Sequence, residues 1–224
     1  LGFKLFNTDN NHLDQKEGRI YLRLELEALK KAVETTNKSE QKRHLTNALT
    51  FRKYRHLLYP GADTTENLLE LNEGLAEYTG LSVAGRTDKQ TVKYFKQSIN
   101  SFLSNPTFVR SFAYQTTPIY GYLTAKAKKE WNKEISINTN LTNYFVTKLN
   151  ILLPKELKRS VESILDQYNA AGIISEENVR EEVEELSRHY PVWTSDVNDL
   201  PSACTMIEQI GSLTHTTEKA KVII

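Results

Sequence analysis

The sequence is poor in several features that would point to a function class. Its single cysteine, Cys204, excludes an internal disulfide framework and any cysteine-based zinc cluster. No apolar run approaches the ~20 residues that a membrane-spanning helix needs, and no signal peptide is visible. Positive and negative charges nearly cancel, with a formal net charge of +1 at pH 7. We therefore expect neither a nucleic-acid partner nor a membrane span, and the sequence leaves the compartment open.

The two ends of the sequence are unusual. The only methionine is Met206, residues 1–6 form an apolar segment, and residues 222–224 read as an unfinished strand. These features predict a soluble piece of a longer protein, trimmed at the N-terminus or at both ends, and leave open export with removal of a signal segment. A strand over 220–224 would then pair with a segment that this sequence does not contain.

What the sequence does contain is helical periodicity. Caps, prolines and glycines divide the chain into a series of amphipathic segments, and no strand is strongly supported. We predict an all-α multi-helix bundle with minor strand content near the termini. We expect Asp14 to cap a helix over about 14–33 and Ser39 to cap one over 39–59. A capping box of Asp63 and Glu66 would open the helix over 63–80, and Gly80 would end it. The further expected helices cover about 88–104, 107–129 with an interruption near Pro118, 141–152, 154–170 and 175–189. Residues 131–140 are expected to form a loop or a short strand.

Three parts are expected from this pattern. Residues 1–140 would form a helical core that carries the chemistry, 141–190 a helical C-terminal subdomain, and 191–224 an irregular tail. The helices of 141–189 and the tail also offer an interface for another domain of the same protein.

The most informative segment is 66–80, which carries four glutamates at helical spacing. Glu66, Glu70, Glu73 and Glu77 follow one another by four, three and four residues, so they share one face of a helix. Like charges at this spacing cost about 0.2–0.5 kcal/mol per pair in water. We therefore expect cations to face them, either arginines or a metal ion.

The run Asn72-Glu73-Gly74-Leu75-Ala76-Glu77-Tyr78 resembles the second signature helix of the gluzincin zinc metallopeptidases. In that family one helix bears HExxH, which supplies two histidine ligands and the general-base glutamate, and this later helix supplies the third ligand. The resemblance implies that Glu73 is a zinc ligand and that Gly74 lets two helices approach closely. Glu70, Glu77 and Glu66 would surround it as supporting groups together with Arg19, Arg23 and Arg52.

A second segment, 110–123, fits the same resemblance. Gluzincins carry a tyrosine downstream of the third ligand, and its hydroxyl stabilises the oxyanion of the tetrahedral intermediate. The resemblance implies this role for Tyr114 first and Tyr120 second, and Arg110 would hold a carboxylate of a peptide substrate. The departure from the family is that no two of the five histidines form HExxH. Zinc is expected only together with such a segment, whether that segment lies in the rest of the protein or has been lost.

The alternative is a non-catalytic helical scaffold or a degenerate peptidase relative. In that reading the glutamates form a structural ion-pair network with Arg19, Arg23, Arg52 and Arg55, and no open cleft remains. Tyr114 would then be an ordinary core or interface aromatic.

Several polar residues receive simpler interpretations. His12 is expected to cap a turn rather than to lie beside the site, and His44 and His56 are expected to be solvated. Six glutamates between 176 and 185 are expected to form a water-facing helix side. Cys204 lacks partners for a nucleophilic role.

Overall fold

A computed structural model describes residues 9–189 of the chain. These residues fall into one compact unit that ends at Glu181, and into the start of a second unit, of which only the last residues of a helix are described. Within 9–189 every regular element is helical, which confirms the all-α class. The helices are α1 (Lys16–Glu34), α2 (Lys38–Leu58), α3 (Ala62–Leu69), α4 (Leu75–Val83), α5 (Asp88–Leu103), α6 (Ala113–Ala127), α7 (Leu141–Lys148), α8 (Leu157–Ile164) and α9 (Ala170–His189).

Short helical turns connect several of these helices. Three of them are 3-10 turns, η1 (Asn11–Asp14), η3 (Trp131–Glu134) and η4 (Leu165–Tyr168), and η2 (Glu70–Gly74) is a π turn between α3 and α4. The predicted minor strand content is not found in the described residues. Residues 131–134, one place where a short strand was considered, wind into η3 because Trp131 is drawn into the core. The strand expected at 220–224 lies outside the described residues.

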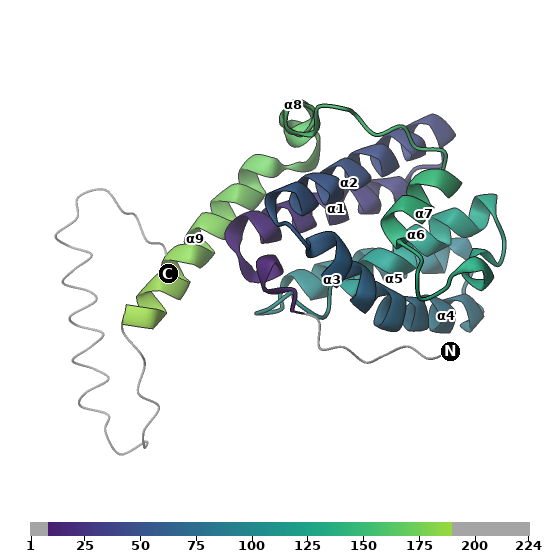
Figure 1. Ribbon diagram of the computed structural model, residues 1–224, viewed down its shortest axis with the longest axis horizontal. Helices are drawn as coiled ribbons and strands as arrows, with labels where there is room; N and C mark the ends of the chain where they lie inside the picture. The colour runs from purple at the N-terminus through teal and green to yellow at the C-terminus, as the bar shows by residue number, and fades with distance from the viewer. Residues whose placement is uncertain (1–8, 190–224) are drawn as a thin grey trace, which may run out of the picture. The chain divides into compact units, whose positions relative to one another are not determined.

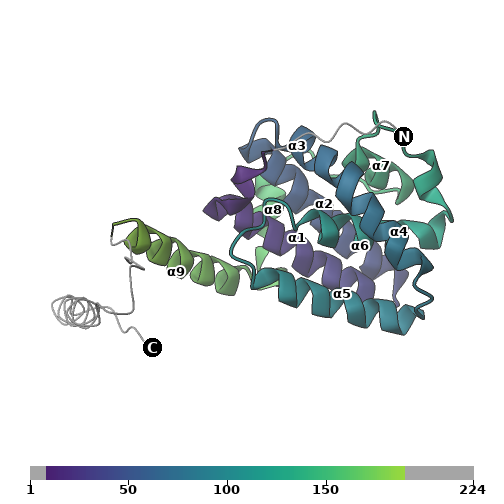
Figure 2. The same ribbon diagram turned by 90° about the horizontal axis from the view of Figure 1, so that it is seen from below.

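The centre of the first unit is the antiparallel pair α1 and α2, joined by a tight connection (Figure 1). Helix α6 packs against α1, α4, α5 and α7, and α8 packs against α2 (Figure 2). One apolar core runs through all of these helices, from Leu13 to Ile173. The boundary expected at residue 140 therefore lies inside a continuous core, to which Phe145 and Val161 contribute.

The helix starts differ from the expected caps because tertiary contacts recruit the capping residues. Asp14 accepts hydrogen bonds from the Thr107 hydroxyl at 2.6 Å and the Phe108 N–H at 2.8 Å, so it anchors a distant loop instead of capping α1. Asn37, not Ser39, caps α2 through its side chain. Gly80 lies inside α4 instead of ending it, and α6 is continuous through Pro118.

No helix among the described residues combines the length and the apolar character that crossing a bilayer requires.

Candidate functional site

The glutamate segment does not form one α-helix, and this divides its carboxylates into two groups. The Leu75 N–H donates to the Glu70 carbonyl oxygen five residues earlier, which defines the π turn η2. A turn closed by an i→i+5 bond advances less per residue around the axis than an α turn, so residues after it rotate away from the original face. Glu66 and Glu70 are buried, with 1% exposed, whereas Glu73 and Glu77 are partly exposed.

Glu70 belongs to a buried ion-pair network centred on Arg52 of α2. The Arg52 guanidinium donates two parallel hydrogen bonds to the Glu70 carboxylate, at 2.9 and 2.8 Å. Its Nε donates a third, at 2.7 Å, to Glu25 of α1. The Thr116 hydroxyl also donates to Glu70. Along two edges of the planar guanidinium, the N–H donors of Arg52 therefore have hydrogen-bond acceptors from the protein, without water.

Glu66 is held in the same way by Arg55, one turn further along α2. The Arg55 Nε and Nη2 each donate to Glu66 at 2.8 Å, and Nη1 donates at 2.9 Å to the second oxygen of Glu25. Glu25 therefore bridges the two arginines, and α1, α2, α3 and η2 are joined by charge at one point. Burial alone would raise the pKa of Glu66, but Arg55 and His56 hold it well below its usual value.

Two histidines complete the surroundings of Glu66, in contrast to the expectation for both. The His12 Nε2 lies 2.7 Å from one oxygen of Glu66, and the His56 Nε2 lies 2.9 Å from the other. His12 is thus beside the glutamate segment rather than at an isolated cap, and the side chain of His56 is only 7% exposed. His44, also expected to be solvated, is buried with Nδ1 2.7 Å from the Tyr168 hydroxyl.

Tyr120, the second candidate for oxyanion stabilisation, is part of this network. Its side chain is fully buried, and its hydroxyl donates to Glu25 at 3.0 Å. Burial and the Glu25 charge raise its pKa well above the usual value. Its ring also lies under the Arg52 guanidinium, 4.9 Å from the centroid. In this position Tyr120 stabilises the ion pairs and has no route to a substrate.

Glu73 stands outside the network. Among the described residues it pairs with Arg110, whose Nη2 donates to it at 2.6 Å. The Glu73 side chain is 23% exposed and that of Arg110 is 64% exposed. An exposed ion pair of this kind contributes at most about 1 kcal/mol, so a ligand can replace it at low cost.

Gly74 places η2 directly against the start of α6. A methyl group at Gly74 would lie 2.4 Å from the Thr117 hydroxyl oxygen and 3.0 Å from the Ala113 carbonyl oxygen. Only glycine therefore fits this contact, as expected from the sequence. Tyr114 follows Ala113 in α6 and is 38% exposed.

Glu77, the last of the four, takes no arginine. It accepts a hydrogen bond of 3.3 Å from the Tyr94 hydroxyl of α5. Together with Glu73 it departs from the expectation that all four glutamates would meet Arg19, Arg23, Arg52 or Arg55.

Arg19 and Arg23 are engaged elsewhere, by the acidic run of α9. Arg19 donates to Glu177 at 2.5 Å and Arg23 donates to it at 2.7 Å, and Arg23 also bonds Glu176. Glu177 is 1% exposed. The expectation of a fully water-facing acidic side is therefore wrong at Glu177, which serves as the buried counterion that fastens α9 to α1.

The sequence interpretation missed Glu25 and Glu177. Glu25 stands between Leu24 and Leu26, and all three residues of this run are buried. A glutamate flanked by two leucines was the available signal, since a buried carboxylate needs a paired cation.

Within residues 9–189 no cluster of three or more histidine, cysteine, aspartate and glutamate side chains is arranged to hold a metal ion. These residues by themselves therefore do not supply the three protein ligands of a catalytic zinc site.

Comparison with known proteins adds no assignment. No family model, no curated protein and no solved structure matches this chain.

Proposed function

We propose that the chain is part of a gluzincin-like zinc metallopeptidase in which Glu73 is one metal ligand. The observation that supports this is the separation of Glu73 from the buried network by the π turn. The same segment holds Glu66 and Glu70 in bidentate arginine pairs, yet leaves Glu73 with one exposed and replaceable partner. π turns occur frequently at functional sites, because they cost helix regularity and need a compensating use.

The other ligands of this zinc site would come from a HExxH segment, which this sequence lacks. The chain's own contribution is then limited to Glu73 and its neighbours. Peptide substrates are the class that the resemblance implies.

Arg110 and Tyr114 have separate roles in this proposal. Arg110 orients the Glu73 carboxylate through the 2.6 Å hydrogen bond, or binds a substrate carboxylate when Glu73 is otherwise engaged. The Tyr114 phenol is a neutral donor near pH 7, and its exposure lets it reach the anionic oxygen of a tetrahedral intermediate. Tyr120 has no role at the site, because its hydroxyl is committed to Glu25.

The second candidate function is a non-catalytic helical scaffold or degenerate peptidase relative. Two observations favour it: the closed network around Arg52 and Arg55, and the lack of a metal-holding group among residues 9–189. Under this reading the Glu73–Arg110 pair is an ordinary surface contact.

The deciding experiment uses the complete gene product. Zinc content is measured by mass spectrometry and hydrolysis with a mixed library of quenched fluorescent peptides, for wild type, Glu73→Gln and Glu77→Gln. Glu77 is the matched control, since it lies one helical turn away and is also partly exposed.

Loss of zinc and of hydrolysis in Glu73→Gln, with Glu77→Gln unchanged, supports the peptidase. A wild-type protein without zinc and without hydrolysis, or a Glu73→Gln variant equal to wild type, rejects it in favour of the scaffold. Circular dichroism of each variant shows whether the fold is kept.

A further inference from the structure

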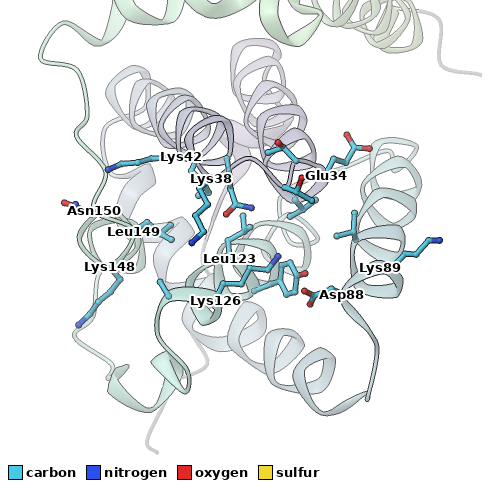
Figure 3. A pocket seen from close by; sticks show the side chains of 18 residues that line it. Glu34, Lys38, Lys42, Asp88, Lys89, Leu123, Lys126, Lys148, Leu149 and Asn150 are labelled. Carbon is cyan, nitrogen blue, oxygen red and sulfur yellow. The ribbon is translucent and has the colours of Figure 1, made fainter.

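A second site lies at the other end of α6, away from Glu73. A cavity of about 890 Å³ opens between the C-terminal ends of α1, α6 and α7 and the N-terminal ends of α2 and α5 (Figure 3). Its volume is in the range of pockets that hold small organic molecules. The distance along α6 from Tyr114 to Lys126 is roughly 18 Å at 1.5 Å per residue, so the two sites are separate.

The rim of the cavity is strongly basic. Five of its lining residues are lysines, Lys38, Lys42, Lys89, Lys126 and Lys148, against two carboxylates. Figure 3 shows the Lys38 and Lys126 side chains pointing into the hollow, and Lys42, Lys89 and Lys148 extending at its edge.

Within residues 9–189 most of these lysines have no paired carboxylate. Lys148 pairs with Glu134 at 3.1 Å, and the lining residue Glu34 is itself occupied by Lys96. Among the described residues no carboxylate forms an ion pair with Lys38, Lys42, Lys89 or Lys126. Lys126 instead lies over the Tyr122 ring, 4.4 Å from its centroid.

Two of these lysines stand where helix electrostatics disfavours them. Lys38 is the first residue of α2 and Lys89 is the second residue of α5. A cation at a helix N-terminus is unfavourable by about 0.3–1 kcal/mol, because the first backbone N–H groups already carry positive partial charge. Local stability gains nothing from these positions, and of the two lysines Lys38 directs its charge into the hollow.

The floor of the cavity is apolar. Leu123 and Leu149 line its base, and Val33, Leu45 and Val92 contribute further aliphatic surface. Burial and the neighbouring Asp88 carboxylate raise the pKa of the Tyr122 hydroxyl, which keeps it neutral. The site therefore combines aliphatic surface with ammonium groups.

We propose that this cavity binds a small amphipathic anion, an aliphatic chain that ends in a carboxylate or a phosphate. The chain would cover the leucine and valine floor, and the head group would lie between Lys38 and Lys126. Neither a purely inorganic anion nor an apolar molecule uses both features of the lining. The proposal does not depend on the zinc peptidase.

The test is titration calorimetry of the whole chain with four probes below their micelle concentrations. Decanoate and decyl phosphate carry the proposed chemistry and distinguish the two head groups. Decyltrimethylammonium reverses the charge, and inorganic phosphate lacks the chain. We expect one of the first two to bind at one site, and the last two to bind at least about tenfold more weakly.

Two variants locate the binding site. Lys38→Glu combined with Lys126→Glu reverses both inward charges and should weaken binding at least about tenfold. Lys155→Glu combined with Lys158→Glu changes charge equally on exposed positions away from the cavity and should change binding less than about twofold.

A third variant, Val92→Thr, removes apolar surface at constant shape and should also weaken binding. The proposal is overturned if neither anion binds, if the cationic probe binds equally well, or if both double variants behave alike.

Discussion

Arg52 and Glu70 share two parallel hydrogen bonds, at 2.9 and 2.8 Å, although neither side chain has appreciable contact with water. Burying two charges is costly, and the pair is tolerated because Glu25, Thr116 and Thr142 occupy the remaining hydrogen-bonding positions. The arrangement fixes the distance between α2 and η2. It is therefore the part of the molecule most sensitive to substitution.

Arg52→Met should lower the free energy of unfolding by about 3–5 kcal/mol, since it leaves Glu70 buried without its bidentate partner. Arg43→Met is the control on the same helix, because Arg43 is exposed and bonds only the Gln167 side chain. It should cost about 0.5 kcal/mol or less. Urea unfolding followed by circular dichroism measures both, and equal effects would contradict the structural role of the network.

Acid should destabilise the protein partly through Glu66. Its pKa in the folded state is well below the ordinary value of 4.5, so the ionised carboxylate contributes stability that is complete above that value. This contribution is lost as pH falls below about 4.5 toward the folded-state pKa. Glu66→Gln should be less stable at neutral pH and should show a flatter acid limb in urea midpoints between pH 7 and about pH 3. A variant curve parallel to wild type would refute this assignment.

Substitutions of the two candidate tyrosines, Tyr114 and Tyr120, should affect different measured quantities, namely activity and stability. Tyr120→Phe removes the donor to buried Glu25 and should cost about 1–3 kcal/mol of stability. Tyr114→Phe should leave stability within about 0.5 kcal/mol, because its ring is partly exposed. If the proposed peptidase is correct, Tyr114→Phe lowers kcat by about 10²–10³. Unchanged kcat in a folded Tyr114→Phe would remove Tyr114 from the site.

Gly74 and Gly80 offer a matched pair for the close approach of η2 to α6. A Cβ at Gly74 meets Thr117 at 2.4 Å, so Gly74→Ala should destabilise by about 1–3 kcal/mol. A Cβ at Gly80 meets nothing within 4 Å, and Gly80→Ala should stabilise α4 by up to about 1 kcal/mol. Thermal unfolding of the two variants should therefore shift in opposite directions, and a neutral Gly74→Ala would show that the contact is loose.

Glu177 should control the attachment of α9 more than its neighbour does. The Glu177 side chain is 2% exposed between Arg19 and Arg23, whereas that of Glu176 is 65% exposed. Glu177→Gln should speed amide hydrogen exchange in residues 170–181 by at least about tenfold, and Glu176→Gln by little. Equal exchange in the two variants would mean that apolar packing alone holds this helix.

The sequence predicted the helices better than their ends. Periodicity places α1 and α5 closely, because each buries an apolar stripe. The bounds of α2 were also predicted closely, although it buries polar side chains such as Arg52 and Arg55. The capping residues were misassigned where a side chain has a stronger partner elsewhere, as with Asp14 at Thr107 and Glu66 at Arg55. Those partners are distant in sequence or on another helix, and local patterns contain no information about them.

The sequence predicted which charged residues take part in the candidate site, but not which of them pair with one another. The spacing of the four glutamates left arginines or a metal ion open as their partners, and Glu70 and Glu66 pair with Arg52 and Arg55, both of which were named. The π turn was not foreseen, since nothing in residues 70–74 distinguishes an i→i+5 bond from an α turn. Arg19 pairs with Glu177 of α9, which lies 158 residues further along the chain, and only the tertiary fold brings these two residues together.

The hydrogen bond from the Leu75 N–H to the Glu70 carbonyl oxygen changes the direction in which the side chains of one continuous helical segment point. Before this bond in the sequence, the carboxylates of Glu66 and Glu70 join neighbouring helices through buried ion pairs. After it, the carboxylate of Glu73 is partly exposed to solvent. Because α3, η2 and α4 follow one another without a loop, Glu73 lies on a helical segment that the buried ion pairs of Glu66 and Glu70 hold in place. Deleting one residue from this turn would restore a regular α-helix, and the Glu73 side chain would then point to the same side as Glu66 and Glu70.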